Sequence, residues 1–323
     1  MSALPIQSLS APSLNSCLPH VSRELFIVFN PGSGSQDKDE ARKAITAAFD
    51  EAHCTYRFIE DPSGDVQKAC AQAARLAGQA DGVLVAVGGD GTISAAAQAA
   101  YDQDCVLGVI AQGTFNMFSR DHGLPQDPGE AAQLVTKGHV RGVQAGLINR
   151  QIFLVNASVG LYPKILADRE DVKQKLGRKR WVALLAALKS LFGWRSRLHL
   201  DIELDGQLRK LTTPSVFICN NSMQLERVGI NGAVTEAVGN GRLAGIVTTH
   251  LDMWAKVRLV AAAIRGKLDE EPEVVSFSMR SLKLAARHAR RLKVAVDGEV
   301  HAMQLPIQIS VAARPLRVML PAS

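Results

Sequence analysis

A short segment of the chain, Gly88-Gly89-Asp90-Gly91, places one carboxylate among three glycines, between an apolar stretch and an alanine-rich one. Glycines let backbone N–H groups approach an anion closely, and a helix that starts here adds partial positive charge. Because a carboxylate repels phosphate, Asp90 suits such a turn when a divalent cation lies between them, or when it orients a hydroxyl nucleophile. Thr92 is predicted to be the N-cap of that helix, with a hydroxyl that can also reach a phosphate. The pattern indicates phosphoryl transfer; the alternative is that Asp90 only accepts hydrogen bonds from amides of the turn.

Two further turns rich in glycine and asparagine follow apolar stretches: residues 30–35, NPGSGS, and residues 113–118, GTFNMF. From about residue 23 to residue 140, apolar stretches alternate with segments of helical periodicity. This alternation predicts a parallel sheet with helices on both faces. In open sheets of this kind, ligands bind outside the carboxyl ends of the strands. Three such turns at strand ends therefore predict a phosphate-binding site on the first domain.

The rest of the chain has a different pattern. From about residue 141 to residue 323, short strands separated by Gly, Asn and Asp turns predict a β-rich second domain, whose last strand could return to the first domain. One helical stretch, residues 178–194, is expected to interrupt the strands. Residues 1–22, rich in Ser, Pro and Leu, are expected to form a disordered tail.

Composition limits the classes of protein to consider. The 323-residue chain carries a formal charge of +6 and has a pI of about 9.1, which favours an anionic partner. Its five cysteines are scattered without a CxxC pair, and its eight histidines lack metal-ligand spacing. These features favour reduced thiols in a cytoplasmic protein over a disulfide or zinc framework. No stretch of the sequence approaches the roughly 18 consecutive apolar residues of a membrane span.

Seven motifs give the chain a family resemblance. In order they are NPGSG, GGDGT, GTFNMFSRDHGLP, NASVGLYPKILADRE, CNNSMQL, GNGRL and VDGE. Together they resemble the catalytic domain of the diacylglycerol kinase and sphingosine kinase superfamily, particularly its bacterial lipid kinases. The resemblance implies an N-terminal α/β domain like that of NAD kinases and phosphofructokinases, a C-terminal β-sandwich domain that binds the lipid, and an active site in the cleft between them. It also implies ATP and Mg²⁺ as cofactors, and phosphorylation of a hydroxyl of diacylglycerol or a related lipid.

The same resemblance assigns the site residues. Those that would bind the nucleotide are Asn30, Pro31, Gly32, Ser33, Gly34, Gly88, Gly89, Asp90, Gly91, Thr92, Gly113, Thr114 and Asn116. Asp90 would also bind the metal and take part in catalysis. The VDGE motif would supply the base that takes the proton of the lipid hydroxyl, with Glu299 as first choice and Asp297 as second. The alternative for this motif is a β-turn in a hairpin.

Four positions depart from the family pattern. Met117 stands in the third turn where the family often has aspartate. Asn240 stands where some members have the aspartate of a structural magnesium site, so we expect no second metal there. The threonine expected after the second strand is replaced near Glu60, and Ser94 follows GGDGT where asparagine is frequent. These departures bear on substrate preference first and on catalysis second.

A basic and apolar segment, Lys173–Arg197, offers a way to approach a membrane lipid. Its leucines and Trp181 fall on one helical face, surrounded by positive side chains with no acidic residue in the span. This pattern predicts reversible attachment of a cytoplasmic protein to the anionic inner face of the membrane; the alternative is an ordinary helix packed on the second domain. A second basic run, residues 280–293, lacks interleaved aromatics, so we expect a solvated strand face there and no nucleic acid.

Two rival functions stay open at this point. An NAD kinase-like enzyme shares GGDGT but usually differs in the third turn. A catalytically weak, membrane-associated protein that binds nucleotide or lipid is suggested by Met117 and Asn240, whereas Asp90, Asp297 and Glu299 argue against it. The chain is also compatible with a homodimer.

Overall fold

The computed structural model describes residues 23–30, 32, 38–160, 163, 197–249, 252–286 and 289–322. Residues 1–22 lie outside this part of the chain, as does all of the Lys173–Arg197 segment except its last residue. The expected tail and the expected membrane segment therefore stay expectations. Three of the predicted nucleotide-binding residues, Pro31, Ser33 and Gly34, also lie outside the described residues.

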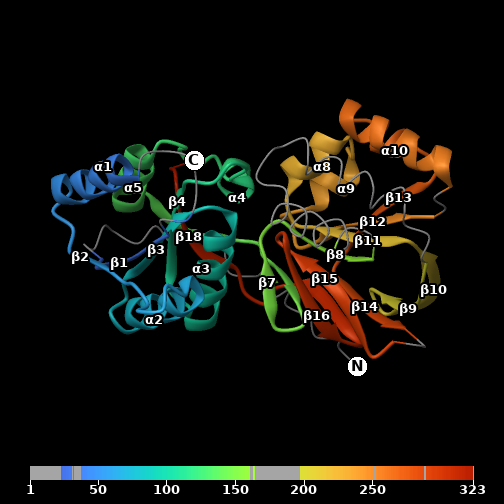
Figure 1. Ribbon diagram of the computed structural model, residues 1–323, viewed down its shortest axis with the longest axis horizontal. Helices are drawn as coiled ribbons and strands as arrows, with labels where there is room; N and C mark the ends of the chain where they lie inside the picture. Colours follow the sequence, from blue (N-terminus) through green and yellow to red (C-terminus); the bar gives the residue numbers. More distant parts are fainter. Residues whose placement is uncertain are drawn as a thin grey trace, which may run out of the picture.

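A six-stranded sheet with the order β2-β1-β3-β4-β18-β5 forms the centre of the N-terminal domain (Figure 1). Its strands are β1 (Leu25–Phe29), β2 (Tyr56–Phe58), β3 (Val83–Gly88), β4 (Val106–Ala111), β5 (His139–Val143) and β18 (Leu316–Leu320). Neighbouring strands run parallel except β5, which is antiparallel to β18. The predicted α/β domain is confirmed, with β5 as the exception to its parallel sheet. The last strand of the chain, red in Figure 1, crosses back from the second domain into this sheet.

Helices cover both faces of this sheet. They are α1 (Lys38–Glu51), α2 (Val66–Gln79), α3 (Asp90–Gln103) and α5 (Pro128–Lys137). Successive strand residues point to opposite faces, so Phe26 and Val28 pack with α2 and α3, whereas Leu25 and Ile27 pack with α1 and α5. Every residue of β3 is buried, as expected for a strand covered on both sides.

The C-terminal domain contains two six-stranded antiparallel sheets, ordered β10-β9-β14-β17-β6-β7 and β13-β12-β11-β8-β15-β16. Their strands are β6 (Gly146–Ile148), β7 (Gln151–Phe153), β8 (Asn156–Gly160), β9 (Leu198–Leu204), β10 (Gln207–Thr213), β11 (Ser215–Cys219), β12 (Leu243–Thr248), β13 (Val274–Met279), β14 (Ser281–Ala286), β15 (Arg291–Val296), β16 (Glu299–Gln304) and β17 (Ile307–Val311). Side chains from both sheets, including Phe153, Ile218 and Leu284, share one buried core. The predicted β-sandwich is confirmed.

The expectation of a single helical stretch in the second domain is wrong. The structure shows further helices there, α8 (Ser222–Val228), α9 (Ala233–Ala237) and α10 (Met253–Arg265), which lie together at the top of this domain in Figure 1. The sequence marks the start of α10 with an N-cap residue, Asp252. Its carboxylate accepts a hydrogen bond from the Ala255 amide at 2.7 Å. Within the described residues, no helix is long and apolar enough to cross a membrane.

The domains contact each other through α8 and the short helix α4 (Met117–Asp121), which follows the third glycine turn. The carboxylate of Asp121 accepts a hydrogen bond from the Met223 amide at 3.1 Å. The side chain of Asn221 donates to the Met117 carbonyl at 3.3 Å. These contacts hold the third turn of the first domain against the second domain.

Candidate active site

The described residues of the three glycine-rich turns lie close together at the carboxyl ends of the strands of the first sheet. The pairing of β1, β3 and β4 brings their carboxyl ends together, with Phe29 opposite Val87 and Gly88 opposite Ala111. The side-chain amide of Asn30, from the first turn, donates to the Thr92 hydroxyl at 2.8 Å. The predicted clustering at the strand ends is therefore present for every described member of the set.

These turns pack too closely for larger residues at two glycines. A methyl group on Gly88 would lie 2.6 Å from the Thr92 hydroxyl oxygen. A methyl group on Gly113 would lie 2.8 Å from Asn116 Oδ1 and 2.9 Å from the Gly89 α-carbon. All three distances are shorter than van der Waals contact, so the backbone can pack this closely only where these two residues lack side chains. The backbone is consequently what they present to a ligand.

Asp90 joins the second turn to the third. One oxygen of its carboxylate accepts a hydrogen bond from the Asn116 amide at 3.1 Å, and the other from the Met117 amide at 2.9 Å. Asp90 therefore satisfies free N–H groups at the start of α4 rather than amides of its own turn. The prediction that Thr92 is the N-cap of α3 is wrong: Gly89 holds that position, and Thr92 lies in the first turn of the helix.

The VDGE motif is a tight hairpin turn between β15 and β16, so the alternative of a β-turn is present as well. Asp297 and Gly298 occupy its centre with φ values of 46° and 91°, the positive values that a two-residue hairpin turn of type I′ requires. The half-buried Asp297 carboxylate accepts hydrogen bonds from the amides of residues 154–156 at 2.8 to 3.0 Å, and from the Ser94 hydroxyl of α3 at 2.7 Å. Burial raises the pKa of this carboxyl, and these hydrogen bonds oppose that shift. Asp297 thus connects the two domains.

Glu299 lines a cavity of about 550 Å³ between the domains. Its side chain is 56% exposed. The other lining residues come from the first domain and are Asn30, Asp65, Val66, Gln67, Gly89, Gly91, Thr92 and Ala95. A methyl group on Gly91 would lie 3.5 Å from Glu299 Oε1, which places this carboxylate directly opposite the glycine turn. The predicted residues Glu299 and Asp297 are therefore close in sequence but differ completely in environment.

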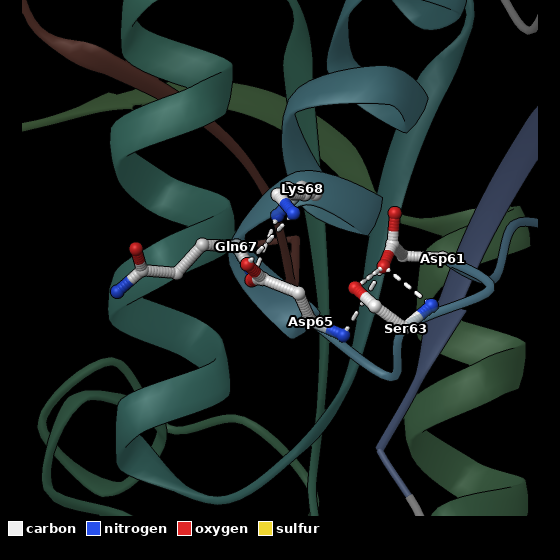
Figure 2. A network of polar contacts seen from close by, with 5 residues as sticks. All are labelled: Asp61, Ser63, Asp65, Gln67 and Lys68. Carbon is white, nitrogen blue, oxygen red and sulfur yellow. Dashed lines mark hydrogen bonds and ion pairs between the residues drawn. The ribbon is translucent and has the colours of Figure 1, made fainter.

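The loop between β2 and α2 forms part of the cavity wall, and the sequence interpretation missed it. Asp65 caps α2 by accepting hydrogen bonds from the Gln67 and Lys68 amides at 3.0 and 3.2 Å. Asp61 accepts hydrogen bonds from the amide and hydroxyl of Ser63, which lower its pKa. Figure 2 shows the Gln67 side chain extending away from this network. The Ser-Gly-Asp sequence before a helical pattern is an N-cap signal that could have located this loop.

Among the described residues, no group of three or more His, Cys, Asp or Glu side chains is placed to hold a metal ion. Asp90 is the predicted metal ligand, and both of its oxygens already accept one hydrogen bond each. A carboxylate oxygen has a second lone pair, so these contacts leave Asp90 able to bind a cation from the side of the turn. Mg²⁺ often takes only one or two protein carboxylates together with substrate phosphates. A single aspartate at the predicted phosphate-binding turn fits that pattern.

Comparison with known proteins identifies the class of this two-domain protein. The family profile described as "Diacylglycerol kinase catalytic domain" matches residues 24–148. The profile described as "YegS C-terminal NAD kinase beta sandwich-like domain" matches residues 159–320. These matches correspond to the α/β domain and to the β-sandwich. The chain therefore belongs to the diacylglycerol kinase family, and it is a lipid kinase.

Individual relatives agree with this class. A diacylglycerol kinase of Bacillus subtilis (strain 168) is 25% identical over 302 residues, which cover 91% of this chain and 95% of the relative. A diacylglycerol kinase of Staphylococcus aureus (strain MRSA252) is 25% identical over 283 residues, covering 84% and 85%. The crystal structure of a diacylglycerol kinase from Bacillus anthracis str. Sterne matches with a TM-score of 0.65 at 21% identity, covering 93% of this chain and 97% of that one. A second structure from that organism gives 0.72 at 23% identity, covering 95% and 97%. The solved structures share the fold.

Proposed function

We propose that this lipid kinase transfers the γ-phosphate of ATP to a hydroxyl of diacylglycerol or a related lipid in the cavity between the domains. The observation that carries the proposal is the position of Glu299, a second-domain carboxylate that faces the glycine turn of the first domain across the cavity. One wall offers backbone amides to phosphate, and the other offers a base to the acceptor hydroxyl. Both are needed for phosphoryl transfer to an alcohol.

The nucleotide is held by the first domain. Backbone N–H groups of Gly88–Thr92, at the start of α3, and of the turn at Gly113–Asn116 would bind the phosphates, aided by the dipole of α3. Asn30 would support this turn through its bond to Thr92. Asp90 would hold Mg²⁺, which neutralises phosphate charge when it is bound.

The second domain would supply the base that accepts the proton of the lipid hydroxyl. A lipid hydroxyl is a poor nucleophile at neutral pH, and a positioned carboxylate that accepts its proton typically contributes about 10²–10⁴-fold. Glu299 takes the proton while the hydroxyl oxygen bonds to the γ-phosphorus and the bond to ADP breaks. Asp297 is unsuited to this step, because its oxygens already accept four hydrogen bonds. It serves instead to hold the hairpin.

A radiolabelled phosphate-transfer screen tests the proposal. The full chain is incubated with [γ-³²P]ATP, Mg²⁺ and, in separate reactions, diacylglycerol, monoacylglycerol, phosphatidylglycerol, ceramide, sphingosine or NAD. We expect label in one of the lipids, with diacylglycerol as first choice, and none in NAD. Label in NAD alone would support the NAD kinase-like alternative. No label in any acceptor, with ATP still bound, would support a binding protein of weak activity.

Attachment to the membrane is a separate proposal that rests on the sequence of Lys173–Arg197. Positive side chains near an anionic leaflet each contribute on the order of 1 kcal/mol to reversible binding. Replacement of Arg178, Lys179 and Arg180 by Gln should therefore release the protein from anionic vesicles in co-sedimentation, and high salt should have the same effect. If neither treatment releases the protein, the segment does not bind the membrane through its charge.

A further inference from the structure

His301 is a neighbour of Glu299 on strand β16. Because side chains alternate along β16 and His301 follows Glu299 by two residues, both project from one face of the strand. His301 Nε2 lies 3.9 Å from Glu299 Oε2. This ring nitrogen is closed off from solvent and has no hydrogen-bond partner among the described residues. His301 was not among the residues that the sequence pointed to.

A buried ring nitrogen without a partner is unfavourable, so the surroundings of His301 matter. Across the sheet its neighbour on β15 is Val294, which offers no polar side chain. Glu299 is the side chain placed to meet it. The distance of 3.9 Å is longer than a hydrogen bond, but a half-exposed glutamate can close it by rotating its side chain with no movement of the backbone.

The two oxygens of Glu299 face different partners. Oε2 is the oxygen near His301, whereas Oε1 is the oxygen near the glycine turn, 3.5 Å from the position of a methyl group on Gly91. A hydrogen bond from His301 to Oε2 would therefore leave Oε1 directed across the cavity. An exposed glutamate that is held in one orientation spends more time where it can accept a proton, and such orientation has a large effect on rate.

We propose that His301 is a positioning residue for the base: its Nε2–H donates a hydrogen bond to Glu299 Oε2 and keeps Oε1 turned toward the phosphate-binding turn. The proposal rests on the proposed function of Glu299, but the His301–Glu299 contact can be observed without activity. If His301 only filled space in the wall of the sandwich, any side chain of similar size would replace it.

Kinetics of matched variants separate these two roles. His301→Leu removes the donor and keeps the bulk, whereas His301→Gln supplies an N–H donor at a similar reach. His199→Leu is the matched control, because His199 is an exposed histidine on β9 whose ring pairs with the Thr212 hydroxyl at 3.1 Å. We expect His301→Leu to lower kcat by about 10- to 100-fold with unchanged KM for ATP and lipid. His301→Gln should recover most of that loss, and His199→Leu should behave like wild type.

NMR of the ¹⁵N-histidine-labelled protein observes the contact itself, with and without a non-hydrolysable ATP analogue. The Nε2–H signal of His301 is assigned by its disappearance in His301→Gln, and we expect Glu299→Gln to shift or abolish it. If the signal depends on Glu299 while wild type transfers no phosphate, the contact stands and the proposed function fails. An Nε2–H signal that is unchanged in Glu299→Gln would overturn the proposal. A His301→Leu variant with wild-type kcat would overturn it as well.

Discussion

The glycine turn of the first domain and the hairpin turn of the second use their aspartates in the same way. Asp90 accepts hydrogen bonds from two amides of the next turn, and Asp297 accepts them from the amides of residues 154–156. The two turns differ in what faces the cavity. In the first it is the backbone around Gly91, and in the second it is the side chain of Glu299. In both turns the aspartate orders the backbone by accepting hydrogen bonds from amides, and Asp90 keeps a second lone pair on each oxygen for the proposed cation. Glu299 is the carboxylate that we propose as the base.

The largest effect on stability is expected at Asp297. Asp297→Ala leaves the three amides of residues 154–156 without their acceptor, and each unsatisfied buried group costs roughly 1–3 kcal/mol, so we expect a loss of at least about 3 kcal/mol. Urea unfolding followed by circular dichroism measures it. Asp297→Asn keeps one acceptor oxygen and should lose less. An unchanged midpoint in Asp297→Ala would show that the hairpin does not need this carboxylate.

The corresponding change in the first turn should mainly affect catalysis. Asp90→Ala removes a capping interaction worth about 1–2 kcal/mol and, with it, the proposed Mg²⁺ ligand. We expect turnover to fall by at least about a hundredfold, since groups that act in the transition state matter by orders of magnitude. The assay is phosphate transfer to the lipid acceptor, with folding checked by thermal melting. A variant that keeps more than roughly a tenth of wild-type turnover would remove Asp90 from the mechanism.

Two glycines of the proposed nucleotide-binding turns form a matched pair. A methyl group on Gly113 would meet the Gly89 α-carbon at 2.9 Å, whereas one on Gly91 would meet only Glu299 among the described residues, at 3.5 Å. We therefore expect Gly113→Ala to weaken ATP binding by about tenfold or more, a difference of about 1.4 kcal/mol, and Gly91→Ala to leave it near normal. Isothermal titration with ATP compares them. Equal affinities in the two variants would show that the close packing of the turns is unimportant for the nucleotide.

The smallest expected effect concerns the pH dependence of stability. Burial lowers the pKa of His122, which packs edge-on against Phe118 with ring centroids 4.6 Å apart. Because the folded pKa lies below the unfolded one, the contribution of His122 to stability is present above about pH 6.5 and is lost as the pH falls through the folded pKa. The melting temperature of wild type should drop by a few degrees as the pH is lowered below that value. His122→Gln should reduce this drop, whereas His199→Gln should not; equal drops in all three proteins would exclude His122 as the cause.

Much of the site follows from local sequence. The order of strand, glycine turn and helix is encoded within a few residues, so the clustering around Gly88 and Gly113 could be predicted from the parallel sheet. The role of Asp297 could not, because its acceptor contacts join segments more than 140 residues apart and depend on how the domains meet. The same limit applies to Asp90, whose partner amides lie 26 and 27 residues further along the chain.

Other features carried local signals that were overlooked. The Asp252 cap precedes a thirteen-residue helix, α10, inside a region that otherwise alternates like strands. The Asp65 cap starts α2 at the cavity wall. His301 is different, because a lone histidine on an edge strand has no sequence signal. Only its position beside Glu299 suggests a role for it, and that position depends on the pairing of β15 and β16.

The division of roles between Asp297 and Glu299 is tested most directly by single-turnover phosphate transfer in Glu299→Gln. The amide keeps the size of the side chain and cannot act as the base, so ATP binding and unfolding midpoint should match wild type while turnover falls by at least about a hundredfold. Asp297→Asn, measured in parallel, should lose stability and keep more turnover than Glu299→Gln. Full turnover in Glu299→Gln, together with an inactive but stably folded Asp297→Asn, would make Asp297 the base. Full turnover in both variants would show that another residue is the base.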